Sequence, residues 1–158
     1  MQNNVLLKVN KMKIVRKSVF ETNSSSCHSI SIESGDVYTS ITPNSDNKIV
    51  LDPMEFGWET ENYNDPISKL TYSWIYVEDW SGENKEKFHK ILSDVVCEHT
   101  GADEIIMKSS GKSWCEYGYI DHQSVECGAL NYLFDDPQQL KEFIFSSKSV
   151  LRTDNDNY

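Results

Sequence analysis

Apolar and polar residues alternate in several short segments of the chain, which is the pattern of strands that bury one face. The first segment is residues 13–20, and the second is residues 28–34, whose strict alternation places His28, Ile30 and Ile32 on one face. Further strands are predicted at residues 48–51, 104–108, 114–121 and 149–153, and residues 34–47, rich in Gly, Ser, Thr, Pro, Asn and Asp, are predicted to form a loop.

Three other segments have the periodicity of amphipathic helices. An Asp-Pro pair at residues 65–66 provides an N-cap and a first-turn proline for the first helix. The second is predicted to begin at Ser81 and to end at Gly101, which suits a C-cap. A second Asp-Pro pair at residues 136–137, with Gln139 behind it, begins a short third helix. The apolar positions are Ile67, Leu70, Trp74, Ile75 and Val77, then Phe88, Ile91, Leu92, Val95 and Val96, and finally Leu140, Phe143 and Ile144.

The order of these elements is β-β-β-α-α-β-β-α-β, which is not the regular alternation of a parallel βαβ fold. We therefore predict an α+β fold, with a largely antiparallel sheet and about three helices, mainly on one face. Residues 1–11 are predicted to be a loose N-terminal extension, and residues 12–158 a single α+β domain, as the length of 158 residues favours.

The composition indicates a polar, charged surface around a hydrophobic core. The hydrophobic fraction is 38% and the mean hydropathy is -0.56. No stretch approaches the roughly 18 apolar residues of a membrane span, and the apolar run at residues 5–7 is too short for a signal-peptide core. We therefore expect a cytoplasmic protein without membrane contact. In that compartment the four cysteines, Cys27, Cys97, Cys115 and Cys127, are expected to be reduced.

Charge is distributed unevenly along the chain. The first 20 residues carry a net charge of +5, so the whole-chain value of -10 leaves -15 on residues 21–158. A body this acidic repels nucleic acid, and direct nucleic-acid binding is not expected. The acidic residues either keep the protein soluble or form a face that occupies a basic groove on a partner protein.

Acidic and aromatic residues are interleaved in one loop region, which is the candidate partner-binding surface. Aromatic side chains supply binding energy at interfaces, and carboxylates steer a basic partner. The alternative is a solvated loop with Trp58 buried in the core. The candidate surface comprises Glu55, Phe56, Trp58, Glu59, Glu61 and Tyr63.

The cysteines and histidines do not predict a metal site. Cys97 and His99 point to opposite sides of the second helix, and Cys115 and His122 are seven residues apart in a strand, on opposite faces. No CxxC pair is present. We expect neither a metal nor a cofactor.

Two polar segments form the candidate ligand pocket: the TNSSS turn before His28, and GYIDHQS at residues 118–124. Hydroxyls near an imidazole suggest nucleophilic chemistry, but geometry defines a triad and no G-x-S-x-G elbow is present, so no catalytic residue is assigned. The competing interpretation is a pair of hydrogen-bonded turns and a core histidine. We predict that the segments lie together, with His28 near His122. The candidate pocket comprises Thr22, Asn23, Ser24, Ser25, Ser26, His28, Tyr119, Asp121, His122, Ser124 and Asp154.

The stretch RKSVFETNSSSCHSI, residues 16–30, resembles the opening of uncharacterised proteins of phages and mobile elements, which have a basic residue followed by F-E-T-N-S-S-S-x-H-S. GYIDHQS and the tail SVLRTDND, residues 149–156, are similar to later blocks of those proteins. The three segments cover about 30 residues spread across the chain, and the first is the most specific. The resemblance implies a phage or prophage accessory gene. Small phage accessory proteins often act against host defences, as anti-CRISPR inhibitors do.

Two functions remain open. The first is a binding protein in the host cytoplasm, which inhibits a host defence or nucleic-acid-handling protein through its acidic surface. The second is an enzyme, or a protein that sequesters a small nucleotide in the polar pocket; catalysis is the less favoured form of it. Convergence of His28, His122 and Asp154 on one cleft would favour the pocket, and their dispersal would favour the surface.

Overall fold

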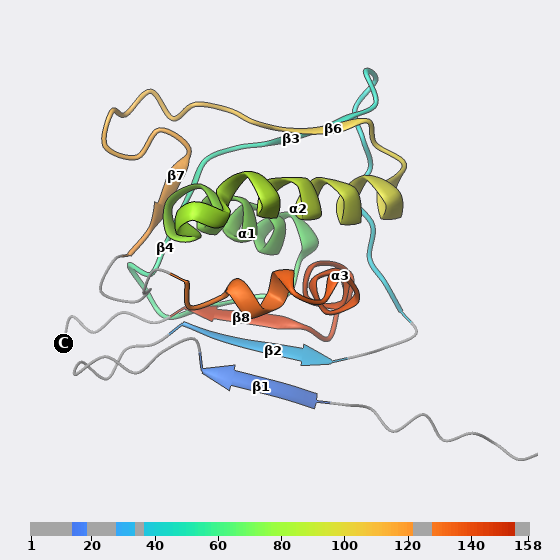
Figure 1. Ribbon diagram of the computed structural model, residues 1–158, viewed down its shortest axis with the longest axis vertical. Coiled ribbons are helices and arrows are strands. Elements are labelled where there is room, and N and C mark those ends of the chain that lie inside the picture. Colours follow the sequence, from blue (N-terminus) through green and yellow to red (C-terminus); the bar gives the residue numbers. More distant parts are fainter. Residues whose placement is uncertain (1–13, 19–27, 34–36, 122–127, 154–158) are drawn as a thin grey trace, which may run out of the picture.

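The computed structural model describes residues 14–18, 28–33, 37–121 and 128–153 (Figure 1). These residues form a mixed α+β fold, as predicted. The extension expected at residues 1–11 lies outside the described ranges.

The largest sheet is antiparallel and has the strand order β1-β2-β8-β5. Ile30 and Ile32 on β2 and His28 just before it are all buried, which confirms the face predicted from their alternation. The predicted strand at residues 149–153 becomes β8, one of the two inner strands, which pairs with β2 through Ile30 and Leu151. The bounds are Ile14–Ser18 for β1, Ser29–Glu33 for β2, Glu61–Tyr63 for β5 and Val150–Thr153 for β8.

Two parallel pairs of short strands accompany this sheet. β3 (Lys48–Leu51) pairs with β6 (Glu104–Met107), and both match their predicted ranges closely. β4 (Met54–Phe56) pairs with β7 (Gly118–Ile120). β7 is shorter than the predicted strand, because the chain turns before it and the Gly118 N–H donates to the Cys115 carbonyl at 3.2 Å.

The helices begin and end close to the predicted residues. Asp65 accepts a hydrogen bond from the Ser68 N–H at 2.8 Å, and Asp136 caps the third helix in the same way. Gly101 ends the second helix with φ of 76°. That helix begins after Ser81, because residues Gly82–Asn84 form a 3-10 turn first. The bounds are Pro66–Trp80 for α1, Lys85–Thr100 for α2 and Pro137–Phe145 for α3.

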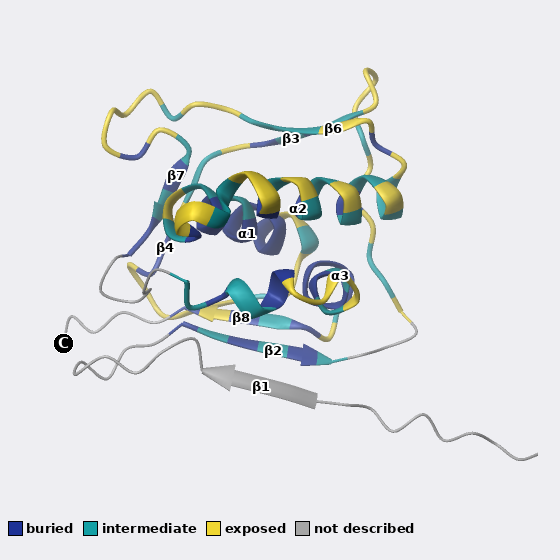
Figure 2. Cartoon of the chain, in the orientation of Figure 1, coloured by how far each residue is buried: buried dark blue, intermediate teal, exposed yellow. Residues whose placement is uncertain are grey.

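The helices lie between the antiparallel sheet and the β3–β6 pair (Figure 1). α3 packs on β2, and α1 and α2 pack on α3 from the other side. Helix α1 is therefore covered on nearly every side, whereas α2 keeps an exposed side (Figure 2). A single apolar stripe describes α1 poorly: Ile67 is 40% exposed, while Tyr72 and Tyr76 are fully buried.

Lys69 is the one charged residue of α1 that the structure buries completely. Its Nζ donates to the carbonyl oxygens of Ser146 and Ser149, at 2.8 and 3.0 Å. These carbonyls belong to the turn between α3 and β8, so Lys69 ties α1 to the turn that leads into the inner strand β8. Burial lowers the pKa of Lys69 to about 8, against the opposing influence of Asp65.

Among the described residues, none of the helices is long and apolar enough to cross a membrane.

Candidate functional site

A buried polar cluster forms beside α1, where β2 begins and where β4 and β7 end. His28 precedes β2, Gly57 follows β4, and Asp121 follows β7. His28 Nδ1 lies 2.9 Å from the Tyr72 hydroxyl, and the Asp121 N–H donates to the Phe56 carbonyl at 2.9 Å. A Cβ on Gly57 would lie 2.9 Å from His28 Nε2 and 2.8 Å from Asp121 Cβ. The imidazole and the carboxylate-bearing side chain therefore meet at the backbone of Gly57.

The structure describes three residues of the predicted pocket: His28, Tyr119 and Asp121. His28 and Asp121 come together, as the pocket hypothesis requires. Tyr119 instead faces away from the buried Ile120 and stacks on Trp58, with the ring centroids 5.3 Å apart. The remaining pocket residues lie outside the described ranges: Thr22, Asn23, Ser24, Ser25, Ser26, His122, Ser124 and Asp154.

Tyr72 is the member of the cluster that sequence reasoning missed. It is fully buried on α1, and burial raises its pKa well above the usual value, so the hydroxyl stays protonated and neutral. A neutral hydroxyl can donate to or accept from the imidazole of His28. His28 is itself fully buried, and the described cluster joins β2, β4, β7 and α1.

Two exposed tryptophans and one tyrosine form a separate site, which we call the aromatic surface: Trp58, Trp114 and Tyr119. Trp58 is 46% exposed and Trp114 is 64% exposed. Tyr119 lies between them, stacked on Trp58 and edge-on to Trp114 at 5.6 Å. The alternative that buried Trp58 in the core was therefore wrong. Sequence reasoning missed Trp114 and assigned Tyr119 to the polar pocket, because only the pairing of β4 with β7 brings the two residues beside Trp58.

A carboxylate and an ammonium group are fixed to the aromatic surface. Glu55 Oε2 accepts from Trp58 Nε1 at 3.0 Å, and Glu55 Oε1 accepts from Lys112 Nζ at 2.8 Å. Lys112 Nζ also lies 5.6 Å from the centroid of the Trp114 ring. The hydrogen bond with Lys112 holds the pKa of Glu55 below its usual value.

The residues of the predicted partner-binding surface divide by exposure. Glu59 and Glu61 are exposed, as Trp58 is, and Glu55 lies at the same edge. Phe56 is a correction, because it is fully buried against the Tyr72 ring and belongs to the core beneath the surface. Tyr63 is half-buried and packs edge-on against Phe56 at 5.2 Å.

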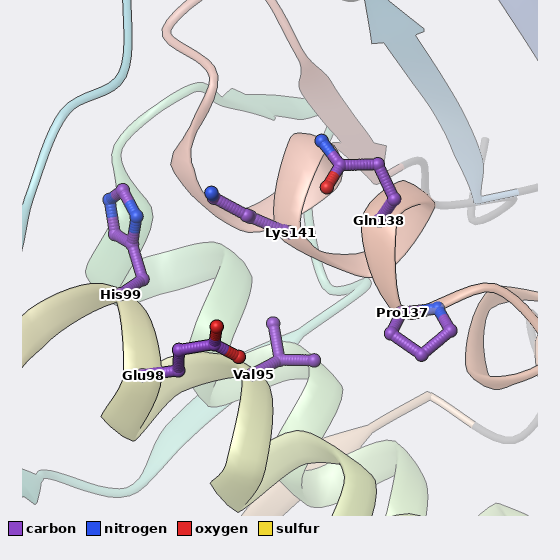
Figure 3. A pocket seen from close by; sticks show the side chains of 6 residues that line it. All are labelled: Val95, Glu98, His99, Pro137, Gln138 and Lys141. Carbon is purple, nitrogen blue, oxygen red and sulfur yellow. The ribbon is translucent and has the colours of Figure 1, made fainter.

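A groove of about 290 Å³ runs between α2 and α3 (Figure 3). His99 of α2 and Lys141 of α3 reach into it from opposite sides, and Glu98 lies below them (Figure 3). The His99 ring also packs on Phe145, with the centroids 4.1 Å apart. The groove thus offers groups of both charge signs to a small polar molecule. Its lining residues are Val95, Glu98, His99, Pro137, Gln138 and Lys141.

The pKa of His99 is lowered, first by burial and second by the positive charge of Lys141. We therefore expect Lys141→Gln to raise the pKa of His99 towards its usual value, while the contribution of burial remains. The unfolded state binds more protons than the folded state between the two pKa values of this histidine, so His99 lowers stability as the pH falls through 6.5. An NMR titration of the His99 ring measures the shift. The matched control is Lys90→Gln, an exposed lysine more than two turns earlier on α2, which should leave that pKa unchanged.

The described cysteines are two free thiols, the half-buried Cys97 and the buried Cys115. Cys27 and Cys127 lie outside the described residues. Cys97 Sγ lies 3.8 Å from Ser93 Oγ, while His99 packs on Phe145. Within the ranges that the structure describes, no group of three or more His, Cys, Asp or Glu side chains could hold a metal ion.

No protein-family model matches the chain, and no curated protein or solved structure is significantly similar to it.

Proposed function

We propose that this protein acts by binding, and that the aromatic surface with its surrounding carboxylates docks on a basic surface of a partner protein. The observation that carries the proposal is the exposure of Trp58 and Trp114 on either side of Tyr119. Removing a large aromatic side chain from water is favourable, so exposed rings gain free energy when a partner covers them. Tryptophan and tyrosine are enriched among the residues that dominate the binding energy of protein interfaces.

The charges around the aromatic surface favour a basic partner. Residues 52–61 and 108–119, which carry it, include five acidic and two basic side chains, a net charge of -3. The two lysines are already paired, Lys108 with Asp52 at 3.0 Å and Lys112 with Glu55 at 2.8 Å. Exposed pairs of this kind contribute little to stability, so these carboxylates remain available for exchange with a partner.

The resemblance of residues 16–30 to phage and mobile-element proteins supports a more specific form of this proposal. The protein is a phage accessory protein of the host cytoplasm that inhibits a host defence or nucleic-acid-handling protein, in the manner of anti-CRISPR inhibitors. An inhibitor with an acidic face competes with nucleic acid for the groove that normally holds it.

One observation favours the second function, a polar pocket that sequesters a small nucleotide. His28 and Asp121, which come from segments far apart in the chain, meet at Gly57. Titration calorimetry with a panel of mono- and dinucleotides tests this function directly, since sequestration requires heat of binding that Asp121→Ala abolishes while the variant stays folded.

The partner-binding function predicts a strong effect of charge reversal at the aromatic surface. We expect changing Glu55, Glu59 and Glu61 together to Lys to slow association with the partner about tenfold or more at low salt, because steering by carboxylates raises the association rate. The partner is obtained by affinity capture from host cells and identified by mass spectrometry, and the rate is then measured with the purified partner by surface plasmon resonance.

The matched control reverses three exposed carboxylates at another part of the molecule, Asp46, Glu83 and Asp103. This variant has the same net charge as the first. If both triple variants slow association equally, only the net charge matters. If neither changes the rate or its dependence on salt, the carboxylates around the aromatic surface serve solubility alone.

A further inference from the structure

Lys112 is a cation already bound to the aromatic surface of the free protein. Its Nζ contacts the Glu55 carboxylate at 2.8 Å and lies over the ring of Trp114 at 5.6 Å. A carboxylate and an aromatic face on one cation are the two contacts that proteins use to recognise a basic side chain.

The carboxylate of this arrangement is held in place before any partner arrives. Trp58 Nε1 donates to Glu55 Oε2 at 3.0 Å, which leaves Oε1 directed at the cation. Glu55 also lies opposite Tyr119 in the β4–β7 pairing, so a strand backbone sets its position. The contacts to the cation therefore belong to an ordered site rather than to a chance pair of long side chains.

The lysine itself is the replaceable component. Its side chain is 51% exposed, and it projects from the loop between β6 and β7. An exposed lysine–carboxylate pair contributes little net free energy. An arginine fits the same two contacts better, because its planar guanidinium stacks on an indole ring and donates two parallel hydrogen bonds to a carboxylate.

We propose that Glu55 and Trp114 form a subsite for an arginine side chain of the basic partner, and that Lys112 occupies this subsite in the free protein. The inference rests on the proposed binding function and names the chemistry that the partner presents. Lys112 must leave its place when the arginine binds, so it acts as an internal competitor. Its removal should therefore strengthen binding, although Lys112 lies within the site.

The probe for this subsite is a nine-residue peptide of three Arg-Gly-Gly repeats, compared with its Lys-Gly-Gly counterpart. Titration calorimetry at low salt measures the dissociation constants with the full-length protein. We expect Lys112→Met to bind the arginine peptide about fivefold more tightly than the wild type does, and Glu55→Gln and Trp114→Ala to bind it about fivefold or more weakly. The lysine peptide should bind the wild type several-fold more weakly than the arginine peptide.

Lys108→Met is the matched control, because it removes the same charge from the same loop. Lys108 pairs with Asp52 and contacts none of the three rings in the described contacts. Its removal reports the general effect of charge, which we expect to be less than twofold. Near-ultraviolet circular dichroism verifies that each variant keeps the native fold.

The results separate the subsite from the binding function on which it rests. Equal gains for Lys112→Met and Lys108→Met, equal affinity for the two peptides, or no binding of either peptide would overturn the arginine subsite. In each of these cases the charge-reversal experiment with the captured partner still decides whether the aromatic surface is the docking site. Conversely, a gain for Lys112→Met with no effect of charge reversal places the arginine subsite outside the partner interface.

Discussion

Alanine in place of Gly57 is expected to lower the free energy of unfolding by about 2 to 5 kcal/mol. Gly57 has a φ of 100°, a conformation that side chains with a Cβ rarely adopt, and this alone costs about 1 to 3 kcal/mol. The new methyl group would also lie 2.9 Å from His28 Nε2 and 2.8 Å from Asp121 Cβ. His28 is fully buried, so it cannot move aside without disturbing its contact with Tyr72.

Urea denaturation of Gly57→Ala and Gly111→Ala separates the two causes. Gly111 also has a positive φ, of 76°, but a Cβ there meets nothing within 4 Å. We expect Gly111→Ala to lose only the backbone contribution, about 1 kcal/mol. If the two variants lose the same stability, the polar cluster is looser than its contacts indicate. A large loss only at Gly57 identifies the meeting of His28 and Asp121 as a rigid part of the fold.

The second large effect is a rise in stability at alkaline pH that depends on Lys69. The pKa of Lys69 is about 8 in the folded protein and 10.5 in the unfolded chain. Between these values the unfolded state binds more protons, so stability rises with pH. Burying the charged Lys69 ammonium group costs free energy of folding. This cost is fully present below pH 8 and is relieved as the pH rises towards 10.5. The shift corresponds to about 3 kcal/mol.

The comparison with Lys69→Met isolates this effect, because the other titrating groups are common to both proteins. We expect the stability of the wild type to rise by about 3 kcal/mol relative to that of the variant between pH 8 and 10.5, measured by urea denaturation at several pH values. Lys90→Met, which removes an exposed lysine, should show no such divergence. Parallel curves for the wild type and Lys69→Met would mean that the buried amine has an ordinary pKa.

The helices and the longer strands were predictable because their signals are local. The Asp-Pro caps at residues 65–66 and 136–137 and the glycine at 101 lie at the ends that the structure shows. β4 and β5 have three residues each, which is too short for an alternating pattern to stand out. The parallel pairing of β4 with β7 was not predictable either, because it joins segments more than 60 residues apart.

Some residues of the candidate site could also be predicted from the sequence, and others could not. The composition of the two polar segments indicated that they lie together with His28 near His122, since buried polar groups need partners. His28 does meet Asp121 of the second segment, whereas His122 lies outside the described residues. Tyr72 was missed because a tyrosine within an apolar helix looks like core, and Lys69 because α1 is buried between two layers rather than along one stripe. Trp114 was predicted to lie in a strand, and its exposure follows from a turn that no periodic pattern reveals.

The position of β8 in the sheet has a consequence for the order in which this protein can acquire its structure. β8 lies between β2 and β5, so the strand that joins the two sides of the sheet is the last of them to be synthesised. On a translating ribosome, β5 must wait through about 90 further residues, and β2 through about 115, for the partner that connects them. One contact of α1 is delayed as well, because Lys69 donates to the carbonyls of Ser146 and Ser149, which lie just before β8 in the chain. The sheet therefore closes only after translation has passed residue 153, and until then its strand edges are exposed to chaperones and to neighbouring nascent chains.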